Sequence, residues 1–158
     1  MHNFKSLLNI FFLMAIMPAL SHATGATNMN NITQPMVAEQ IYDKVRSNNN
    51  WKSAFATGAQ AQVVFMSVSP ATNPNNEIGM ETHKFDQIIF VVEGNGNAVL
   101  NGKTSAIKEG DMIFIPLGTA HNIVNLNKDK ELKILSVYSG NDIAADAMYK
   151  KNTDEPKD

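Results

Sequence analysis

The chain has 158 residues, of which 44% are hydrophobic and 18% are charged, and its formal net charge is -2. This length and composition fit one globular domain with enough apolar mass to bury a core. The near balance of charge, with no stripe of clustered Lys and Arg, argues against nucleic-acid binding.

The first 23 residues resemble a secretory signal peptide. Lys5 supplies positive charge, an apolar run follows over residues 7–20, and Ser21-His22-Ala23 places small residues where a signal peptidase cleaves. A retained membrane anchor is the alternative, but the run is short of the roughly 20 residues that a bilayer span requires. We therefore expect a bacterial periplasmic or secreted protein that has no membrane association once residues 1–23 are removed.

The chain contains no Cys, so neither disulfides nor thiolate ligands are available to it. Any metal site must therefore use nitrogen and oxygen ligands.

Residues 24–34 are rich in Thr, Asn and Gly and are expected to form a flexible leader. Apolar residues at helical spacing after Pro35 predict a short helix over 36–46. The main domain is expected over residues 35–145, and residues 146–158 are expected to form a C-terminal tail. Within these regions, residues 143–150 are interpreted as a short helix and residues 152–158 as disordered.

Short strand patterns separated by turn residues fill the middle of the chain. Asn101-Gly102 is a strong signal for a two-residue hairpin turn. No alternation of strands with helices occurs, so the pattern favours an all-β sandwich or barrel with antiparallel strands. The expected strands are 62–69, 88–92, 97–100, 104–107, 112–115, 122–126 and 132–138.

A polar cluster is predicted on the strand that contains Glu81, His83 and Gln87. Side chains alternate along a strand, so these three share one face if no bulge intervenes, and His121 on another strand could close over the same centre. Buried polar groups need partners. A metal ion, a bound ligand or a mutual hydrogen-bond network could each supply them, and each His taken alone could be an ordinary barrel residue.

The segment around His121 resembles the second conserved motif of the cupin superfamily. That motif runs Gly, five residues, Pro, one residue, Gly, two residues, His, three residues, Asn. It is matched at every position by Gly110, Pro116, Gly118, His121 and Asn125. For Asn125 a turn-stabilising role is expected rather than a catalytic one.

The earlier block is similar to the other cupin motif, with two departures. Glu81 stands at the first His position, His83 at the second, Gln87 at the Glu position, and Gly94 at the closing glycine. The two motifs and their flanking strands cover residues 60–138. The block also resembles a subgroup of small bacterial cupins labelled mannose-6-phosphate isomerase-like.

The resemblance implies a small antiparallel β-barrel of the jelly-roll, double-stranded β-helix type, with a short N-terminal helix. It also implies a divalent metal ion (Fe, Mn, Ni or Zn) held by His83, His121 and Glu81. Gln87 is then a fourth ligand or a hydrogen-bond partner that orients His83.

Two functions follow from the resemblance. One is a metal-dependent enzyme, an oxygenase or isomerase acting on a small molecule, in which Glu81 is the catalytic proton carrier. The other is a non-catalytic barrel that binds a small ligand or sugar. Pairing into a homodimer through edge strands is expected in either case.

Overall fold

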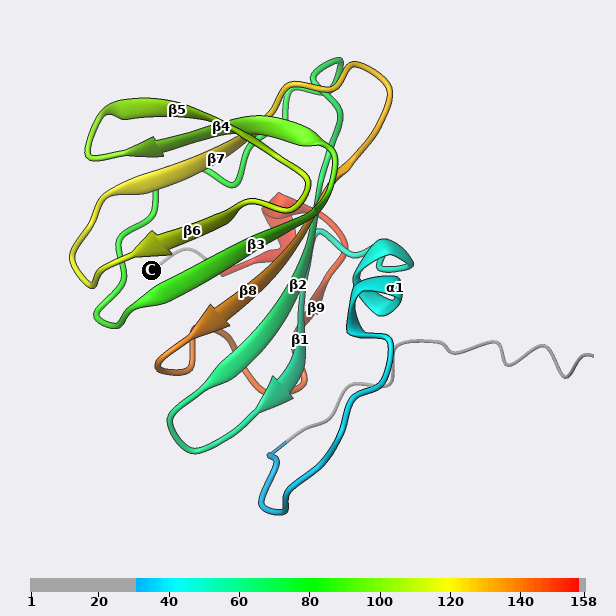
Figure 1. The fold of residues 1–158 in the computed structure, drawn as a ribbon, viewed down its shortest axis with the longest axis vertical. Coiled ribbons are helices and arrows are strands. Elements are labelled where there is room, and N and C mark those ends of the chain that lie inside the picture. The colour runs from blue at the N-terminus through cyan, green and yellow to red at the C-terminus, as the bar shows by residue number, and fades with distance from the viewer. Residues whose placement is uncertain (1–30, 157–158) are drawn as a thin grey trace, which may run out of the picture.

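Nine β-strands, one short α-helix and one 3-10 turn make up residues 31–156, the part of the chain that the computed structural model describes (Figure 1). The expected signal peptide at 1–23, and residues 24–30 of the expected leader, lie outside the described residues. The elements are α1 (Ile41–Arg46), β1 (Lys52–Thr57), β2 (Gln62–Val68), β3 (Gln87–Glu93), β4 (Asn95–Leu100), β5 (Lys103–Lys108), β6 (Met112–Ile115), β7 (His121–Asn125), β8 (Leu132–Tyr138), β9 (Met148–Tyr149) and η1 (Asn152–Asp154).

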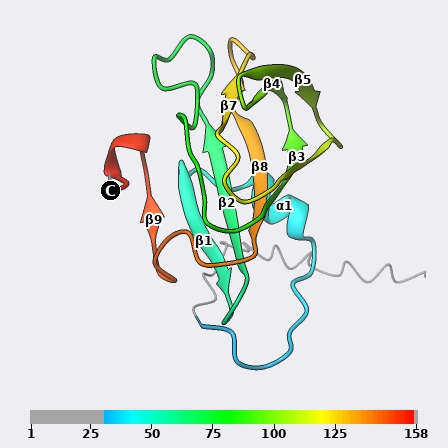
Figure 2. The same cartoon turned by 90° about the vertical axis from the view of Figure 1, so that its left-hand side faces the viewer.

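The strands form two antiparallel sheets, as the all-β prediction required. The larger sheet has the order β6-β3-β8-β2-β1-β9, and the smaller has the order β5-β4-β7. Figure 1 shows the smaller sheet facing the larger one, and Figure 2 shows the same arrangement from the side. The result is a jelly-roll barrel whose interior lies between the two sheets.

The barrel interior is filled by alternate residues of facing strands. Its largest fully buried apolar side chains include Met66, Ile89, Ile115, Ile123 and Ile134. Alternation places every second residue of each strand inside, so a polar side chain at such a position is carried into the core as well. Polar side chains of the functional site are buried in this way at one end of the barrel.

The helix α1 covers the outer face of the larger sheet. It buries Val45 against a separate apolar cluster that includes Phe55 and Phe65, whose rings stack with centroids 4.5 Å apart. The helix begins at Ile41 rather than at residue 36 because Gln40 has a left-handed backbone (φ 51°) that no helix accommodates. Within residues 31–156, no helix has the length and apolar character needed to cross a bilayer.

The hairpin between β4 and β5 confirms the turn prediction. Asn101 and Gly102 have φ values of 48° and 78°. Positive φ at both central residues is the requirement of a type I′ turn, which matches the twist of the flanking strands.

The C-terminal segment differs from the prediction. The helix expected over 143–150 is replaced by β9, which pairs with Lys52 and Ser53 of β1, a strand that was not predicted. Strand β1 has unpaired backbone groups at the edge of the larger sheet, and the C-terminal segment pairs with them. For example, the Ala54 amide donates to the Ala147 carbonyl at 3.0 Å. Residues 152–156 were expected to be disordered, but the structure places the 3-10 turn η1 there.

Candidate metal centre

The two sequence blocks that carry the site lie side by side because residues 76–83 run antiparallel to β7. The Ile78 amide donates to the Ile123 carbonyl at 3.0 Å. Glu81 and His121 form a hydrogen-bonded pair in which each amide donates to the other's carbonyl at 2.9 Å. Residues 40 positions apart in sequence are therefore direct neighbours.

A tight turn connects β6 to β7 and places His121 at the start of β7. Gly118 has a φ of 76°, a conformation that glycine adopts readily, and its amide donates to the His83 carbonyl at 2.9 Å. The Thr119 amide donates to the Pro116 carbonyl at 3.1 Å and closes the turn. The Pro–Gly pair of the motif thus positions both histidines relative to one another.

Glu81, His83 and His121 converge on one point. One ligand atom from each, two imidazole nitrogens and one carboxylate oxygen, lies within 4.8 Å of the others. The Glu81 Oε2 atom is 3.4 Å from His83 Nε2 and 3.9 Å from His121 Nε2. The two imidazole rings have centroids 5.1 Å apart. The predicted convergence of these three residues is present.

Each imidazole is held from its far side. His121 Nδ1 lies 2.9 Å from the Thr119 carbonyl, which can only accept, so Nδ1 carries the proton. His83 Nδ1 lies 3.3 Å from Asp142 Oδ1. The Nε2 atoms of both rings are buried and have no hydrogen-bond partner among the described residues. His121 therefore presents an inward Nε2 lone pair, and the Asp142 contact on Nδ1 favours the same arrangement in His83.

The protonation of the site follows from its surroundings. Burial lowers the pKa of His121 below the usual range, and neighbouring His83 lowers it further, so this ring is neutral at neutral pH. Burial acts to raise the pKa of Glu81, but the close contact with His83 and the charge of Lys52 outweigh it, and the pKa is lowered. An anionic oxygen consequently faces two buried imidazole nitrogens, an arrangement that a cation would stabilise.

Packing fixes the His83 ring. Phe85 stacks on it with centroids 5.2 Å apart and an interplanar angle of 7°, and Tyr138 meets it edge-on at 5.4 Å. Phe85 in turn occupies the space above Gly140, where a Cβ atom would lie 2.6 Å from its ring. The ring is thus oriented by aromatic contacts as well as by Asp142.

Gln87 is buried, but it belongs to the other sheet. A bend at residues 84–85 ends the extended segment, and Gln87 begins β3, so the continuous strand expected from 81 to 87 is absent. Its Nε2 donates to Ser136 Oγ at 3.3 Å and to Tyr138 Oη at 3.1 Å. Its Oε1 is buried without a hydrogen-bond partner among the described residues. Gln87 therefore supplies another buried oxygen acceptor inside the barrel.

Residues 71–138 match the family described as Cupin domain. The structure resembles BH2720 from Bacillus halodurans, with a TM-score of 0.71, 24% identity, and coverage of 79% of this chain and 96% of that one. It also resembles an RmlC-like cupin from Shewanella frigidimarina, with a TM-score of 0.50, 18% identity, and coverage of 58% and 76%. Residues 71–138 of this chain are a cupin domain.

Curated relatives of this cupin include YrkC from Bacillus subtilis, 30% identical over 102 residues, and L612 from Acanthamoeba polyphaga mimivirus, 31% identical over 103 residues. The matches cover 60% and 63% of this chain. The chain spans only 52% and 62% of the length of these two relatives. The expected subgroup, mannose-6-phosphate isomerase-like, stays a prediction.

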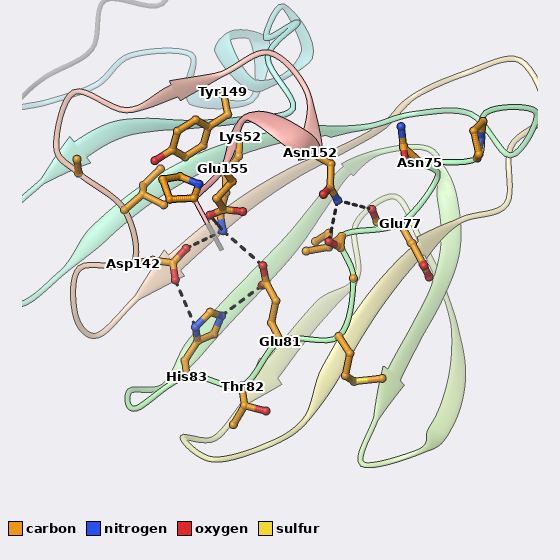
Figure 3. A pocket seen from close by; sticks show the side chains of 17 residues that line it. Lys52, Asn75, Glu77, Glu81, Thr82, His83, Asp142, Tyr149, Asn152 and Glu155 are labelled. Atoms are coloured by element: carbon orange, nitrogen blue, oxygen red, sulfur yellow. Dashed lines mark hydrogen bonds and ion pairs between the residues drawn. The ribbon is translucent and has the colours of Figure 1, made fainter. Parts of the chain in front are cut away.

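Three charged residues that the sequence interpretation missed complete the site of this cupin. Lys52, at the start of β1, is only 1% exposed, and its Nζ lies 2.7 Å from Glu155 Oε1, 2.8 Å from Asp142 Oδ2 and 3.5 Å from Glu81 Oε1 (Figure 3). Burial acts to lower the pKa of Lys52, but Tyr138 and the surrounding carboxylates raise it above the usual range. The lysine is therefore a permanent internal cation.

The loop that carries Asp142 is anchored by a buried glutamine. Gln62 Oε1 accepts from the amides of Asp142 and Ile143 at 2.9 and 3.1 Å, and its Nε2 donates to the Ile143 carbonyl at 2.8 Å. No motif or periodicity marks Lys52, Asp142 or Glu155, and only their spatial convergence identifies them.

A cavity of about 870 Å³ opens beside this cluster. Glu81, His83 and Lys52 line its base, while Asn152 of η1 donates to the Ile78 carbonyl at 3.0 Å and ties the C-terminal segment across one side (Figure 3). The volume falls within the usual range of small-molecule sites.

The residues of the centre fit a divalent metal ion. The donor set is two imidazole nitrogens and one carboxylate oxygen, each imidazole has its Nδ1 occupied, and the two Nε2 atoms are buried without hydrogen-bond partners among the described residues. Two histidines with one carboxylate suit Fe(II), Mn(II), Ni(II) and Zn(II). Second-sphere contacts on the far nitrogen are typical of metal-binding histidines.

Proposed function

We propose that this cupin binds a divalent transition metal through Glu81, His83 and His121 and uses it on a small polar molecule in the adjoining cavity. The observation that carries the proposal is the pair of buried Nε2 atoms, without hydrogen-bond partners among the described residues, that face the Glu81 carboxylate. The ion would supply Lewis-acid polarisation of a substrate oxygen or a site for dioxygen, which corresponds to an isomerase or an oxygenase.

The chain's own groups support an acid–base role beside the ion. Glu81 is ionised because its pKa is lowered, so its carboxylate can accept a proton but does not carry one at rest. The Thr119 carbonyl keeps the His121 proton on Nδ1, and His83 is held between Phe85 and Tyr138. These contacts hold the reacting groups in one orientation before a substrate arrives.

A second candidate function is capture of a small ligand without turnover. The observation that favours it is the cavity itself, whose lining includes the hydrogen-bonding side chains of Asn75, Thr82 and Tyr149. A sugar or another neutral polar molecule would find several partners there.

Elemental analysis of the protein isolated from its native compartment tests the proposal, followed by titration of the metal-free protein with Zn²⁺ and Mn²⁺. We expect about one equivalent of metal, and at least about a tenfold loss of affinity in His83→Ala and in His121→Ala. Lys84→Ala, at an exposed position next to His83, is the matched control and should bind normally.

Absence of bound metal, together with no saturable binding of either ion, contradicts the proposal. Metal-dependent turnover that is lost in His121→Ala favours the enzyme. Ligand retention without turnover favours the binding barrel.

Export and dimer formation are further proposals. The apolar N-terminal run supports export, and N-terminal sequencing of the protein from a periplasmic fraction tests it. The edge strand β6, which carries the exposed side chains of Met112 and Phe114, supports pairing with a second copy. Light scattering on the purified protein measures the oligomeric state.

A further inference from the structure

Lys52 contacts one oxygen of Glu81 and one oxygen of Asp142, and the second oxygen of each carboxylate points toward an imidazole. Its Nζ lies 3.5 Å from Glu81 Oε1 and 2.8 Å from Asp142 Oδ2. The other oxygen of each group faces the histidines: Glu81 Oε2 lies 3.4 Å from His83 Nε2, and Asp142 Oδ1 lies 3.3 Å from His83 Nδ1. Figure 3 shows the two carboxylates between the lysine and the His83 ring.

We infer that Lys52 is a positioning residue of the metal centre. By holding the outer oxygens, it turns Glu81 Oε2 toward the two imidazoles and turns Asp142 Oδ1 toward His83 Nδ1. The inference rests on the proposed function for its metal-binding consequence, while its effect on the His83 ring stands on the geometry alone.

The lysine is well placed for this role because it cannot easily move away. It extends from β1 into the barrel, at a position whose backbone pairs with Met66 on one side and Tyr149 on the other. It is 1% exposed, and no other Lys or Arg lines the cavity within residues 31–156. A buried cation surrounded by carboxylates is retained in place because moving it would leave those charges unpaired.

The consequence for the metal is a restriction on Glu81. With Oε1 engaged by Lys52, only Oε2 is directed at the imidazoles, so Glu81 offers one oxygen rather than two. Ca²⁺ prefers six to eight oxygen ligands and often takes both oxygens of a carboxylate, whereas two imidazoles and one oxygen suit a transition metal. Lys52 thereby contributes to the choice of metal without touching it.

The proton position on His83 is the property that a purely structural role would not change. Asp142 Oδ1 can only accept, so by holding Asp142 Oδ2 the lysine favours a His83 proton on Nδ1 over one on Nε2, which lies 3.4 Å from Glu81 Oε2. Without Lys52, we expect Asp142 to turn and the proton to move to Nε2, where Glu81 Oε2 can accept it. His121 is an internal control because its Nδ1 proton is fixed by a backbone carbonyl.

The test compares Lys52→Gln/Glu155→Gln with Glu155→Gln alone. The double variant removes one positive and one negative charge together, which limits the cost of unpaired buried carboxylates, and the single variant leaves Lys52 on Glu81 and Asp142. Long-range ¹H–¹⁵N correlation spectra of the metal-free protein report which imidazole nitrogen is protonated. His83→Asn provides the assignment, and chelator competition measures the affinity for Zn²⁺.

We expect the double variant to lose the Nδ1–H form of His83, to keep that of His121, and to bind Zn²⁺ about 10- to 100-fold more weakly. Glu155→Gln should match the wild type in both respects, and Lys52→Arg should keep the Nδ1–H form. The inference is overturned by a folded double variant that keeps the His83 proton on Nδ1 and binds Zn²⁺ as tightly as the wild type.

A second double variant keeps the test decisive if the first one does not fold. In Lys52→Met/Glu155→Gln an apolar chain of similar length fills the space, a replacement that buried ion pairs often tolerate, and the same two readouts decide. A wild type that binds no Zn²⁺ contradicts the proposed function, while the His83 proton position in metal-free protein still tests Lys52 independently.

Discussion

The backbone of Glu81 is hydrogen-bonded at both its N–H and C=O to His121, each bond being 2.9 Å long. This pairing places a carboxylate and an imidazole on neighbouring strands before any side chain contact is made. The strand register therefore fixes where the backbones of Glu81 and His121 lie, and the surrounding side chains set the direction of their ligand atoms.

Glu81→Gln should weaken metal binding and leave the fold intact. The backbone pair with His121 does not depend on the side chain, whereas the anionic oxygen that faces the imidazoles is lost. We expect at least about a tenfold loss of Zn²⁺ affinity, or about 1.4 kcal/mol, measured by chelator competition. Glu77→Gln is the matched control, because Glu77 also bridges to β7 and lines the cavity but lies outside the cluster. Equal losses in both variants would contradict a ligand role for Glu81.

Gly140→Ala should disturb the centre from a distance. The added Cβ would lie 2.6 Å from the Phe85 ring, which stacks on His83, so the aromatic ring must shift. We expect a loss of about 1–3 kcal/mol in the free energy of unfolding, together with weaker Zn²⁺ binding. Gly58→Ala is the control, because its Cβ would have an ordinary contact of 3.5 Å with the Ala61 carbonyl. A Gly140→Ala protein with wild-type unfolding midpoint and wild-type affinity would show that Phe85 does not position His83.

Much of the fold could be predicted from the sequence because its strands are short, apolar and separated by turn residues. β6 and β8 have the bounds that were expected, and the Asn101-Gly102 turn is present. Two elements were missed because tertiary pairing decides them. β1 has no regular alternation, and β9 exists only because β1 offers a free edge.

In the site, too, residues marked by local motifs could be predicted, whereas residues brought together only by tertiary contacts could not. His121 could be found because its spacing to Gly118 is set by local turn geometry, and His83 because it stands at a His position of the earlier motif, which closes at Gly94. Lys52 and Asp142 could not, since they come from segments 90 positions apart in sequence and meet only through opposite charge. Gln87 was placed on the same strand as Glu81, and the bend at residues 84–85 moves it to the other sheet.

Asn125→Ala should destabilise the protein without altering the metal centre. Asn125 is 0% exposed, and its Nδ2 donates to the carbonyls of Val68, Ser69 and Lys130. The substitution leaves these carbonyls without that donor, and a buried unpaired group costs about 1–3 kcal/mol. We expect a loss of about 2–4 kcal/mol in urea unfolding, with unchanged Zn²⁺ affinity for the folded protein. Asn49→Ala, at an exposed position, should have no effect. A loss no larger than that of Asn49→Ala would contradict the turn-stabilising role.

Glu131→Gln should remove part of the protein's resistance to mild acid. Burial acts to raise the pKa of Glu131, but hydrogen bonds from Lys133, at 2.6 Å, and Ser67 lower it below the usual value. A carboxyl whose pKa is lower in the folded state stabilises the fold above its unfolded pKa. That contribution disappears as the pH falls through the folded pKa. The variant should therefore be less stable than the wild type at neutral pH, by less than about 1 kcal/mol because the pair is partly exposed.

The difference between Glu131→Gln and the wild type should shrink as the medium is acidified below the usual pKa of glutamate. Urea unfolding midpoints at a series of pH values measure it. Glu39→Gln, at an exposed position before α1, is the reference and should follow the wild type at every pH. A Glu131→Gln curve parallel to the wild type throughout would mean that Lys133 does not stabilise the ionised carboxylate. The buried Lys133 ammonium would then be held by the Asn48 carbonyl and Ser67 Oγ, both of which it also contacts.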